Sequence, residues 1–140
     1  GADRLSYAYP WQALIDRGLM ILAGSDAPVE AGDPRIEFYA AVARKWLDGT
    51  SGPGWHPELA VSRETALKML TIWPAHGAFQ ENVRGSIEVG KYADFTVFSQ
   101  NIITVPNNQL LNTKIQYTII NGKIEYKANW LVKNKLNPFI

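Results

Sequence analysis

Residues 19–28 read LMILAGSDAP, and this stretch points to the fold. Its first five residues are all apolar, which is typical of a strand buried on both faces of a parallel sheet. Glycine and proline then end the strand, and Asp26 stands directly after it. A helix is predicted on each side, one over residues 11–17 and one that begins with Asp33 as N-cap and Pro34 in its first turn. Helix, buried strand, loop and helix in this order indicate an α/β fold.

The helices on the carboxyl side of this stretch show apolar repeats of three and four residues. For the helix that follows Asp33, the repeat predicts a buried face made of Ile36, Tyr39, Ala40, Ala43, Trp46 and Leu47. It leaves Glu37, Arg44, Lys45 and Asp48 mostly outside. A further helix is predicted from Arg63 to about Ile72, capped by Ser62, with a buried face of Ala66, Leu67 and Leu70.

After Gly85 the apolar residues recur at every second position instead of every third or fourth. Residues 94–98 and 115–119 alternate as strands do, and Asn121-Gly122 between residues 119 and 123 is a strong hairpin signal. The chain is therefore expected to divide near residue 80 into an α/β part and a small antiparallel part.

Composition narrows the classes of function. The 140 residues are 46% hydrophobic and 19% charged with a net charge of +1, which is globular and gives no reason to expect a nucleic-acid or membrane partner. Five lysines among residues 100–140 are interpreted as a solvated face. No apolar run is long enough to span a bilayer. The absence of cysteine excludes disulfides and thiol chemistry, and two histidines are too few for a complete histidine-rich metal site.

A single buried strand cannot satisfy its own backbone groups. Each unpaired buried amide or carbonyl costs about 1–3 kcal/mol, so the strand needs neighbours on both sides. Residues 27–80 show no second parallel strand with a crossover. The neighbours are expected in a missing N-terminal portion, with residues 94–126 or another copy of the chain as the alternatives. The start at Gly1 agrees with a cut or processed polypeptide, and without a signal peptide the expected location is cytoplasmic.

Five motifs in order resemble the metal-dependent amidohydrolases, most closely the YtcJ-like branch of that superfamily. They are LAGSDAPV at 22–29, DP with AAVAR at 33–34 and 40–44, LAVSRETAL with TIWPA at 59–67 and 71–75, GSIEVGKYADF at 85–95, and INGK at 120–123. The resemblance runs from about Tyr9 to Tyr126. It implies a (β/α)8 barrel joined to a small β-sandwich that both ends of the chain build. Residues 1–80 would be the last βα units of the barrel and residues 81–140 the C-terminal part of the sandwich, and the missing N-terminal barrel portion would be their partner.

The resemblance also implies a metal centre. In this family histidines, a bridging lysine or acid, and an aspartate after the last barrel strand bind one or two divalent metals, often zinc. Only the aspartate is matched here, by Asp26, which is thereby implied to be both a metal ligand and the catalytic group that takes a proton from the attacking water. This agrees with barrel chemistry, because functional residues of barrels follow the carboxyl ends of strands. Since the other ligands are absent, the chain alone is expected to bind no catalytic metal tightly.

Further residues have two interpretations each. Ser25 and His56 are candidate substrate contacts, with a loop cap and a surface histidine as the alternatives. Arg44 could reach a substrate or a neighbouring loop, although a structural ion pair is favoured, and His76 is expected to pack or cap. Lys91 belongs to the return strand of the sandwich and is not the bridging lysine. The tryptophans expected as core or interface anchors are Trp46, Trp55, Trp73 and Trp130.

The function expected from these observations is the C-terminal portion of a hydrolase that acts on non-peptide carbon–nitrogen bonds of a small amide or cyclic amide. By itself the chain is expected to be inactive. The alternative is a non-catalytic, stand-alone module that forms homo-oligomers or binds a partner through the unpaired strand.

Overall fold

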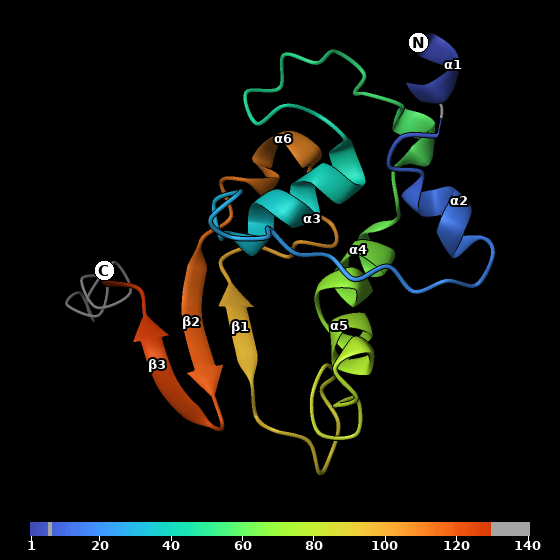
Figure 1. Ribbon diagram of the computed structural model, residues 1–140. Coiled ribbons are helices and arrows are strands. Elements are labelled where there is room, and N and C mark those ends of the chain that lie inside the picture. The colour runs from blue at the N-terminus through green and yellow to red at the C-terminus, as the bar shows by residue number, and fades with distance from the viewer. Residues whose placement is uncertain (6, 130–140) are drawn as a thin grey trace.

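The computed structural model describes residues 1–5 and 7–129, with all helices but the last before residue 80 and the strands after residue 94 (Figure 1). The helices are α1 (Ala2–Leu5), α2 (Trp11–Ile15), α3 (Pro34–Ala43), η1 (Pro57–Leu59), α4 (Arg63–Leu70), α5 (Ile72–Gly77) and α6 (Asn107–Leu110). The strands are β1 (Phe95–Phe98), β2 (Ile115–Ile120) and β3 (Lys123–Lys127). Trp130, Lys133 and Lys135 lie outside the described residues.

The core lies where α3 packs against α4 and α6. Its buried side chains are Phe38, Tyr39, Ala41, Ala43, Val61, Ala66, Met69, Val105 and Leu110. Both long helices begin where the sequence predicts. The Asp33 carboxylate accepts from the Arg35 amide at the start of α3, and the Ser62 hydroxyl accepts from the Thr65 amide at the start of α4. Each side chain satisfies one of the amides that a helix start leaves free.

The predicted buried faces of these helices are partly wrong. α3 ends at Ala43, so the repeat no longer applies beyond it: Trp46 is 73% exposed, whereas Arg44 is 6% exposed. In α4 Ala66 is buried as predicted, but Met69 is buried as well and Leu67 lies at the surface. A side-chain repeat assumes that the helix continues and that its partner covers a fixed stripe. Here α3 stops after ten residues, and the buried side of α4 includes Met69 in place of Leu67.

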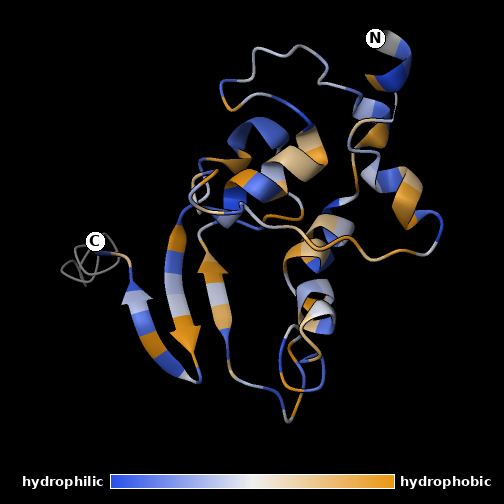
Figure 2. Ribbon diagram, in the orientation of Figure 1, coloured by the Kyte–Doolittle hydropathy of each residue, from blue (hydrophilic) through white to orange (hydrophobic). Residues whose placement is uncertain are grey.

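The segment from Leu19 to Ala23 is not a strand in this chain, which corrects the prediction of a buried one. It runs extended between α2 and α3 without pairing with β1, β2 or β3 (Figure 2). Ala23 donates its amide to the Met69 carbonyl at 2.9 Å, while Leu19 and Leu22 are about half exposed, at 52% and 51%. The reason is physical: strand geometry needs a neighbouring ladder, and the described residues supply none here.

The three strands form one antiparallel sheet in the order β1-β2-β3. Phe95 lies opposite Ile119 in the first pair, and Thr118 lies opposite Tyr126 in the second. Asn121 and Gly122 connect β2 to β3, both with the positive φ that a tight hairpin requires. The Asp94 carboxylate accepts the Asn121 amide at 2.7 Å and so helps to fix this hairpin.

Two arginines tie the sheet part to the helices. Arg35 at the start of α3 donates to the Thr113 carbonyl at 2.7 Å. Arg63 at the start of α4 donates to the Val105 carbonyl at 2.7 Å and also to the Ile102 carbonyl.

Among the described residues, no helix combines the length and the apolar character needed to cross a bilayer.

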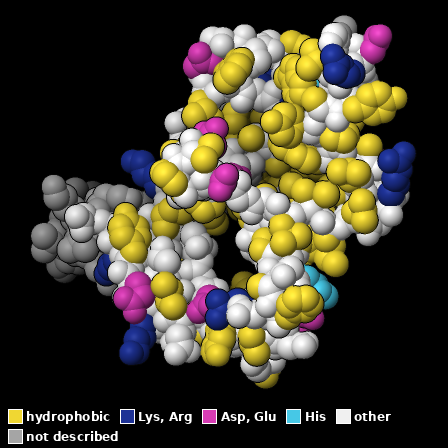
Figure 3. Space-filling model, in the orientation of Figure 1, with side chains coloured by type: hydrophobic (Ala, Val, Ile, Leu, Met, Phe, Trp, Pro, Cys, Tyr) yellow, Lys and Arg dark blue, Asp and Glu magenta, His cyan; other side chains and the backbone are white. Residues whose placement is uncertain are grey.

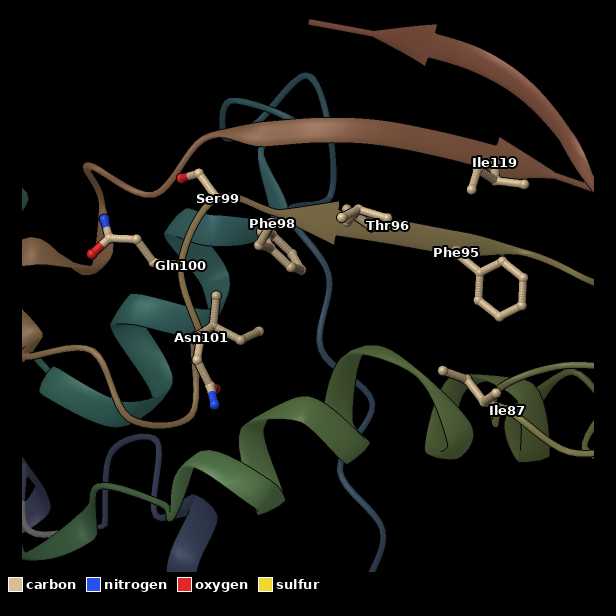
Figure 4. A pocket seen from close by; sticks show the side chains of 10 residues that line it. Ile87, Phe95, Thr96, Phe98, Ser99, Gln100, Asn101 and Ile119 are labelled. Carbon is tan, nitrogen blue, oxygen red and sulfur yellow. The ribbon is translucent and has the colours of Figure 1, made fainter. Parts of the chain in front are cut away.

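A hollow of about 630 Å³ lies along β1, and Ile119 of β2 also lines it. Its lining is mostly apolar, and Phe95 and Ile87 face one another across it (Figure 4). In the space-filling view the molecule is open between the sheet and α5 (Figure 3). None of the site residues predicted from the sequence lines this hollow.

Candidate functional site

Asp26 lies in a tight turn that ends the extended segment. Its φ of 51° is in the left-handed region, which aspartate tolerates better than most residues. The Val29 amide donates to the Asp26 carbonyl at 2.9 Å, and the Glu30 amide donates to the Ser25 carbonyl at 3.2 Å. These bonds hold the turn, while the residue itself is exposed. The structure therefore presents one carboxylate on an ordered backbone.

Both sides of this turn are fixed. Upstream, the bond from the Ala23 amide to Met69 anchors the extended segment on α4. Downstream, Asp33 caps α3 and its carboxylate pairs with Arg35. Ser25 is half-buried beside Asp26, and its carbonyl helps to close the turn. Asp26 is thus positioned by the chain on either side of it.

His56 lies at the other end of α3, because it follows the loop that leaves that helix. A ten-residue helix is about 15 Å long, so the fold separates His56 from Asp26 rather than bringing them together. The His56 Nδ1 lies 2.9 Å from Glu58 Oε1, and the ring packs edge-on against Trp55 with centroids 4.6 Å apart. Hydrogen bonds from the Glu58 backbone amide and from His56 lower the pKa of the Glu58 carboxyl.

Arg44 occupies a place that the sequence did not reveal. Its guanidinium contacts two indole rings, 4.9 Å from the centroid of Trp11 and 4.8 Å from that of Trp55. Nε donates to the Trp55 carbonyl at 2.8 Å and Nη1 to the Tyr9 carbonyl at 3.1 Å. Burial lowers the pKa of the Arg44 guanidinium, and the Glu58 carboxylate partly offsets this effect.

This arrangement replaces the structural ion pair favoured from the sequence. None of the ion pairs that the described residues form involves Arg44. The signal that could have revealed it is weak: tryptophans at 11 and 55 and a tyrosine at 9 are ordinary residues at unrelated positions. Trp55 is 41% exposed and acts as a wall of the Arg44 site rather than as a core anchor. Trp73, in contrast, packs against the core.

Two other residues from the sequence have structural partners. His76 Nδ1 lies 3.7 Å from Glu81 Oε1 in a half-exposed contact. Lys91 is nearly buried and donates to the Ser86 hydroxyl at 2.5 Å, with Glu88 Oε1 at 3.5 Å. Hydrogen bonding from Ser86, with the charge of Lys91 next in importance, lowers the pKa of the Glu88 carboxyl. Lys91 therefore closes its own loop before β1.

The described residues do not by themselves fit a metal centre. No group of three or more histidine, cysteine, aspartate or glutamate side chains gathers anywhere among residues 1–5 and 7–129. A structural or catalytic zinc site needs at least three protein ligands. Asp26 has the right chemistry for one ligand and stands alone. The chain can contribute a carboxylate to a metal site, and the remaining ligands would have to come from elsewhere.

Comparison with known proteins supplies the family. The family model described as "Amidohydrolase family" matches residues 1–126. The chain is 36% identical to YtcJ of Bacillus subtilis (strain 168), a protein named as an amidohydrolase, over 92% of this chain and 24% of that protein. It is 29% identical to the N-substituted formamide deformylase of Arthrobacter pascens, over 85% of this chain and 21% of that enzyme.

The fold agrees with these matches. The amidohydrolase from Thermotoga maritima MSB8 superposes with a TM-score of 0.64 at 23% identity, covering 86% of this chain and 26% of that one. This likeness supports an α/β amidohydrolase fold for the chain. The chain thus spans about a quarter of the length of the relatives it matches. With the family model covering all but the last 14 residues, the chain belongs to the amidohydrolase family.

Proposed function

We propose that this chain is the C-terminal portion of a metal-dependent hydrolase that cleaves non-peptide carbon–nitrogen bonds in a small amide or cyclic amide. Membership of the amidohydrolase family supports the class of reaction. The name of the Arthrobacter pascens relative, a deformylase of N-substituted formamides, supports a small amide as the substrate class. Fold likeness alone would not support a reaction, because one fold hosts many chemistries.

The observation that carries the proposal is the position of Asp26. It is an exposed carboxylate on a turn with fixed ends, directly after an apolar extended segment. In the proposed enzyme Asp26 is one metal ligand, accepts the proton of the attacking water and passes it to the leaving nitrogen. A carboxylate held within hydrogen-bond reach of the water is the requirement for that step. A bound divalent metal, most simply zinc, would lower the pKa of the water towards about 7.

The rest of the catalytic centre and of the fold would come from a portion outside this chain. The segment from Leu19 to Ala23 is proposed as the last strand of a (β/α)8 barrel, because its backbone lacks a ladder here and Leu19, Met20 and Leu22 are about half exposed. The sheet is proposed as the C-terminal part of a β-sandwich, because β1 has a free edge beside an apolar hollow. Residues 1–80 and 81–140 are the proposed parts of these two domains.

The experiment is Asp26→Asn in the longer protein, assayed on N-substituted formamides and cyclic amides. We expect kcat to fall by about 10²–10⁴-fold, the usual effect of losing a general acid–base group, while the circular dichroism spectrum is unchanged. The matched control is Glu30→Gln, which alters an exposed carboxylate in the same turn. Equal activity of the Asp26→Asn protein and the wild type would reject the role of Asp26.

A second measurement concerns the 140-residue chain alone. With one candidate ligand, it is expected neither to retain stoichiometric zinc after dialysis nor to hydrolyse the same amides. Metal analysis and the amide assay read this out directly. Stoichiometric zinc together with metal-dependent turnover would show that the chain holds a complete centre.

A stand-alone, non-catalytic module is the second candidate, favoured by the half-exposed apolar side chains of Leu19, Met20 and Leu22. Such a module would bury them against another copy or a partner. An immunoblot of source cells separates the two candidates. A band several times larger than 15.6 kDa supports the hydrolase, and a band at 15.6 kDa supports the module.

A further inference from the structure

The buried guanidinium of Arg44 joins two segments that are far apart in the sequence. Its Nη1 donates to the Tyr9 carbonyl, 35 residues away, and one face of the group lies over Trp11. Between these contacts the chain passes through α2, the extended segment, the Asp26 turn and α3. Asp26 lies midway, 17 residues after Tyr9 and 18 before Arg44. The stretch that carries Asp26 is therefore a loop whose two ends meet at one side chain.

The same group closes a second, shorter loop. The Trp55 amide donates to the Arg44 carbonyl at 2.8 Å, and Arg44 Nε donates back to the Trp55 carbonyl at 2.8 Å. Gly54 is required beside this pair, because a Cβ at that position would lie 2.9 Å from the Ala43 carbonyl. Residues 45–54 thus leave and return at the same point, where the guanidinium also contacts the Trp11 and Trp55 rings.

The backbone around Arg44 is held in unusual conformations. Tyr9, Arg44 and His56 have φ values of 52°, 49° and 47°, in the left-handed region that residues with a Cβ seldom adopt. Such conformations persist only where the surroundings over-determine them. Here Tyr9 accepts from the Arg44 guanidinium and His56 follows its second acceptor, Trp55. The Arg44 residue is 6% exposed, and its Nη2 finds no partner among the described residues. Strain and a buried charge at one point indicate that this geometry is retained for more than local stability.

We propose that Arg44 is a positioning residue for Asp26, acting by pinning together the two ends of residues 9–44. The inference rests on the proposed role of Asp26 and adds a residue to it. Pinning matters because the extended segment in the middle of this stretch has no strand beside it and donates one amide to α4. Without the pin, α2 and the segment that it leads into are held at fewer points, and the Asp26 turn gains freedom.

Arginine is needed at this place for its shape. A planar guanidinium can contact two rings and still donate in its own plane to two carbonyls. A lysine ammonium keeps the charge, but it is a point donor on a flexible stem and cannot make both contacts with both rings. Arg44→Lys therefore tests geometry at constant charge, and Arg44→Met removes the charge at similar length.

The test is amide hydrogen exchange on the 140-residue chain, read by mass spectrometry in peptides from residues 9–26 and from β1 and β2. We expect Arg44→Lys and Arg44→Met to speed exchange in residues 9–26 by about ten-fold or more while the sheet keeps its protection. The matched controls are Arg17→Lys and Arg17→Met, which alter an exposed arginine within the same stretch and should match the wild type.

Three results would overturn the proposal: full protection in Arg44→Lys, an equal loss of protection in the sheet, or no protection of residues 9–26 in the wild type. If Arg44→Met fails to fold, Arg44→Lys decides. In the longer protein, Arg44→Lys should lower kcat with little change in KM. Hydrogen exchange needs no enzyme activity. If the Asp26→Asn enzyme stays active, the proposed function is rejected, but the effect of Arg44 on residues 9–26 can still be measured.

Discussion

Asp33 shows how one residue can fix the start of an element and join it to a distant one. Its carboxylate accepts the Arg35 amide at 3.1 Å and pairs with the Arg35 guanidinium at 2.5 Å. The guanidinium in turn donates to the Thr113 carbonyl before β2. Hydrogen bonding from the Arg35 side chain, followed by that from its amide, holds the pKa of the Asp33 carboxyl below its usual value. The same bond raises the pKa of Arg35.

Replacing Asp33 by alanine should lower the free energy of unfolding at pH 7 by about 1 kcal/mol, the typical value of an N-cap. Asp33→Asn should lose less, because an amide oxygen also caps a helix. The folded-state pKa is depressed, so the carboxylate stabilises the fold above its unfolded pKa of about 3.9 and loses this effect as the pH falls through the folded value. Urea unfolding at a series of pH values measures it. A gap between wild type and Asp33→Ala that stays constant down to acid pH would contradict this explanation.

At the scale of elements, the loop between α5 and β1 contains two glycines with nearly equal, positive φ angles. Gly85 has a φ of 93° and Gly90 a φ of 95°. A Cβ on Gly85 would lie 2.7 Å from the Ala75 Cβ and 2.9 Å from the Ile72 Cα, whereas a Cβ on Gly90 would meet nothing within 4 Å. Gly85 is where the loop packs directly on α5, and Gly90 only turns the chain.

Alanine at these two positions separates the cost of close packing from the cost of backbone strain. Gly90→Ala should destabilise the chain by about 1–2 kcal/mol through its left-handed conformation alone. Gly85→Ala should cost about 1–3 kcal/mol more, because overpacking adds to the same strain. Chemical denaturation followed by circular dichroism gives both values. Equal effects would show that the loop moves off α5 without penalty.

The elements that the sequence predicted well are those specified by neighbouring residues. Asp33 with Pro34 starts α3, Ser62 starts α4, and Asn121-Gly122 turns β2 into β3, each through a bond or a dihedral angle within a few residues. The prediction for residues 19–23 failed because a strand is defined by its neighbours, and the described chain offers none there. The apolar residues of a segment indicate that it should be buried and paired, but they do not show whether neighbouring strands are present.

The candidate site divides in the same way. Asp26 was selected through the resemblance of residues 22–29 to the amidohydrolases, because the residues alone favour a turn or N-cap aspartate there. Its catalytic role stays a prediction. Arg44 was misjudged because its partners are two backbone carbonyls and two ring faces. None of these has a sequence signature, and the four contacts come from positions as distant as 9 and 55.

At the scale of the whole molecule, the described chain leaves much apolar surface uncovered. Hydrophobic side chains spread over the side where α2 and α4 lie (Figure 3), and an apolar hollow opens along β1. Monomeric proteins seldom expose large contiguous apolar patches. The isolated chain is therefore expected to associate with itself, whichever of the two candidate functions holds.

Self-association should depend on the extended segment rather than on apolar surface in general. Met20→Lys places a charge at a position that is 48% exposed and should shift the chain toward monomer in sedimentation velocity across a concentration series. Val29→Lys, at a position 73% exposed beyond the Asp26 turn, is the control and should leave the distribution unchanged. A strictly monomeric wild type, or equal effects of both variants, would contradict the expectation.

The three arginines that tie this molecule together share one property with a consequence for its tolerance of change. Arg35, Arg44 and Arg63 all donate to backbone carbonyls, at Thr113, at Tyr9 and Trp55, and at Ile102 and Val105. Every residue carries a carbonyl oxygen whatever its side chain, and that oxygen does not titrate. The residues at the acceptor positions can therefore be substituted without loss of these hydrogen bonds, provided that the backbone keeps its conformation. The donor positions have no such latitude, because another side chain does not reproduce the planar fork of donors that a guanidinium presents.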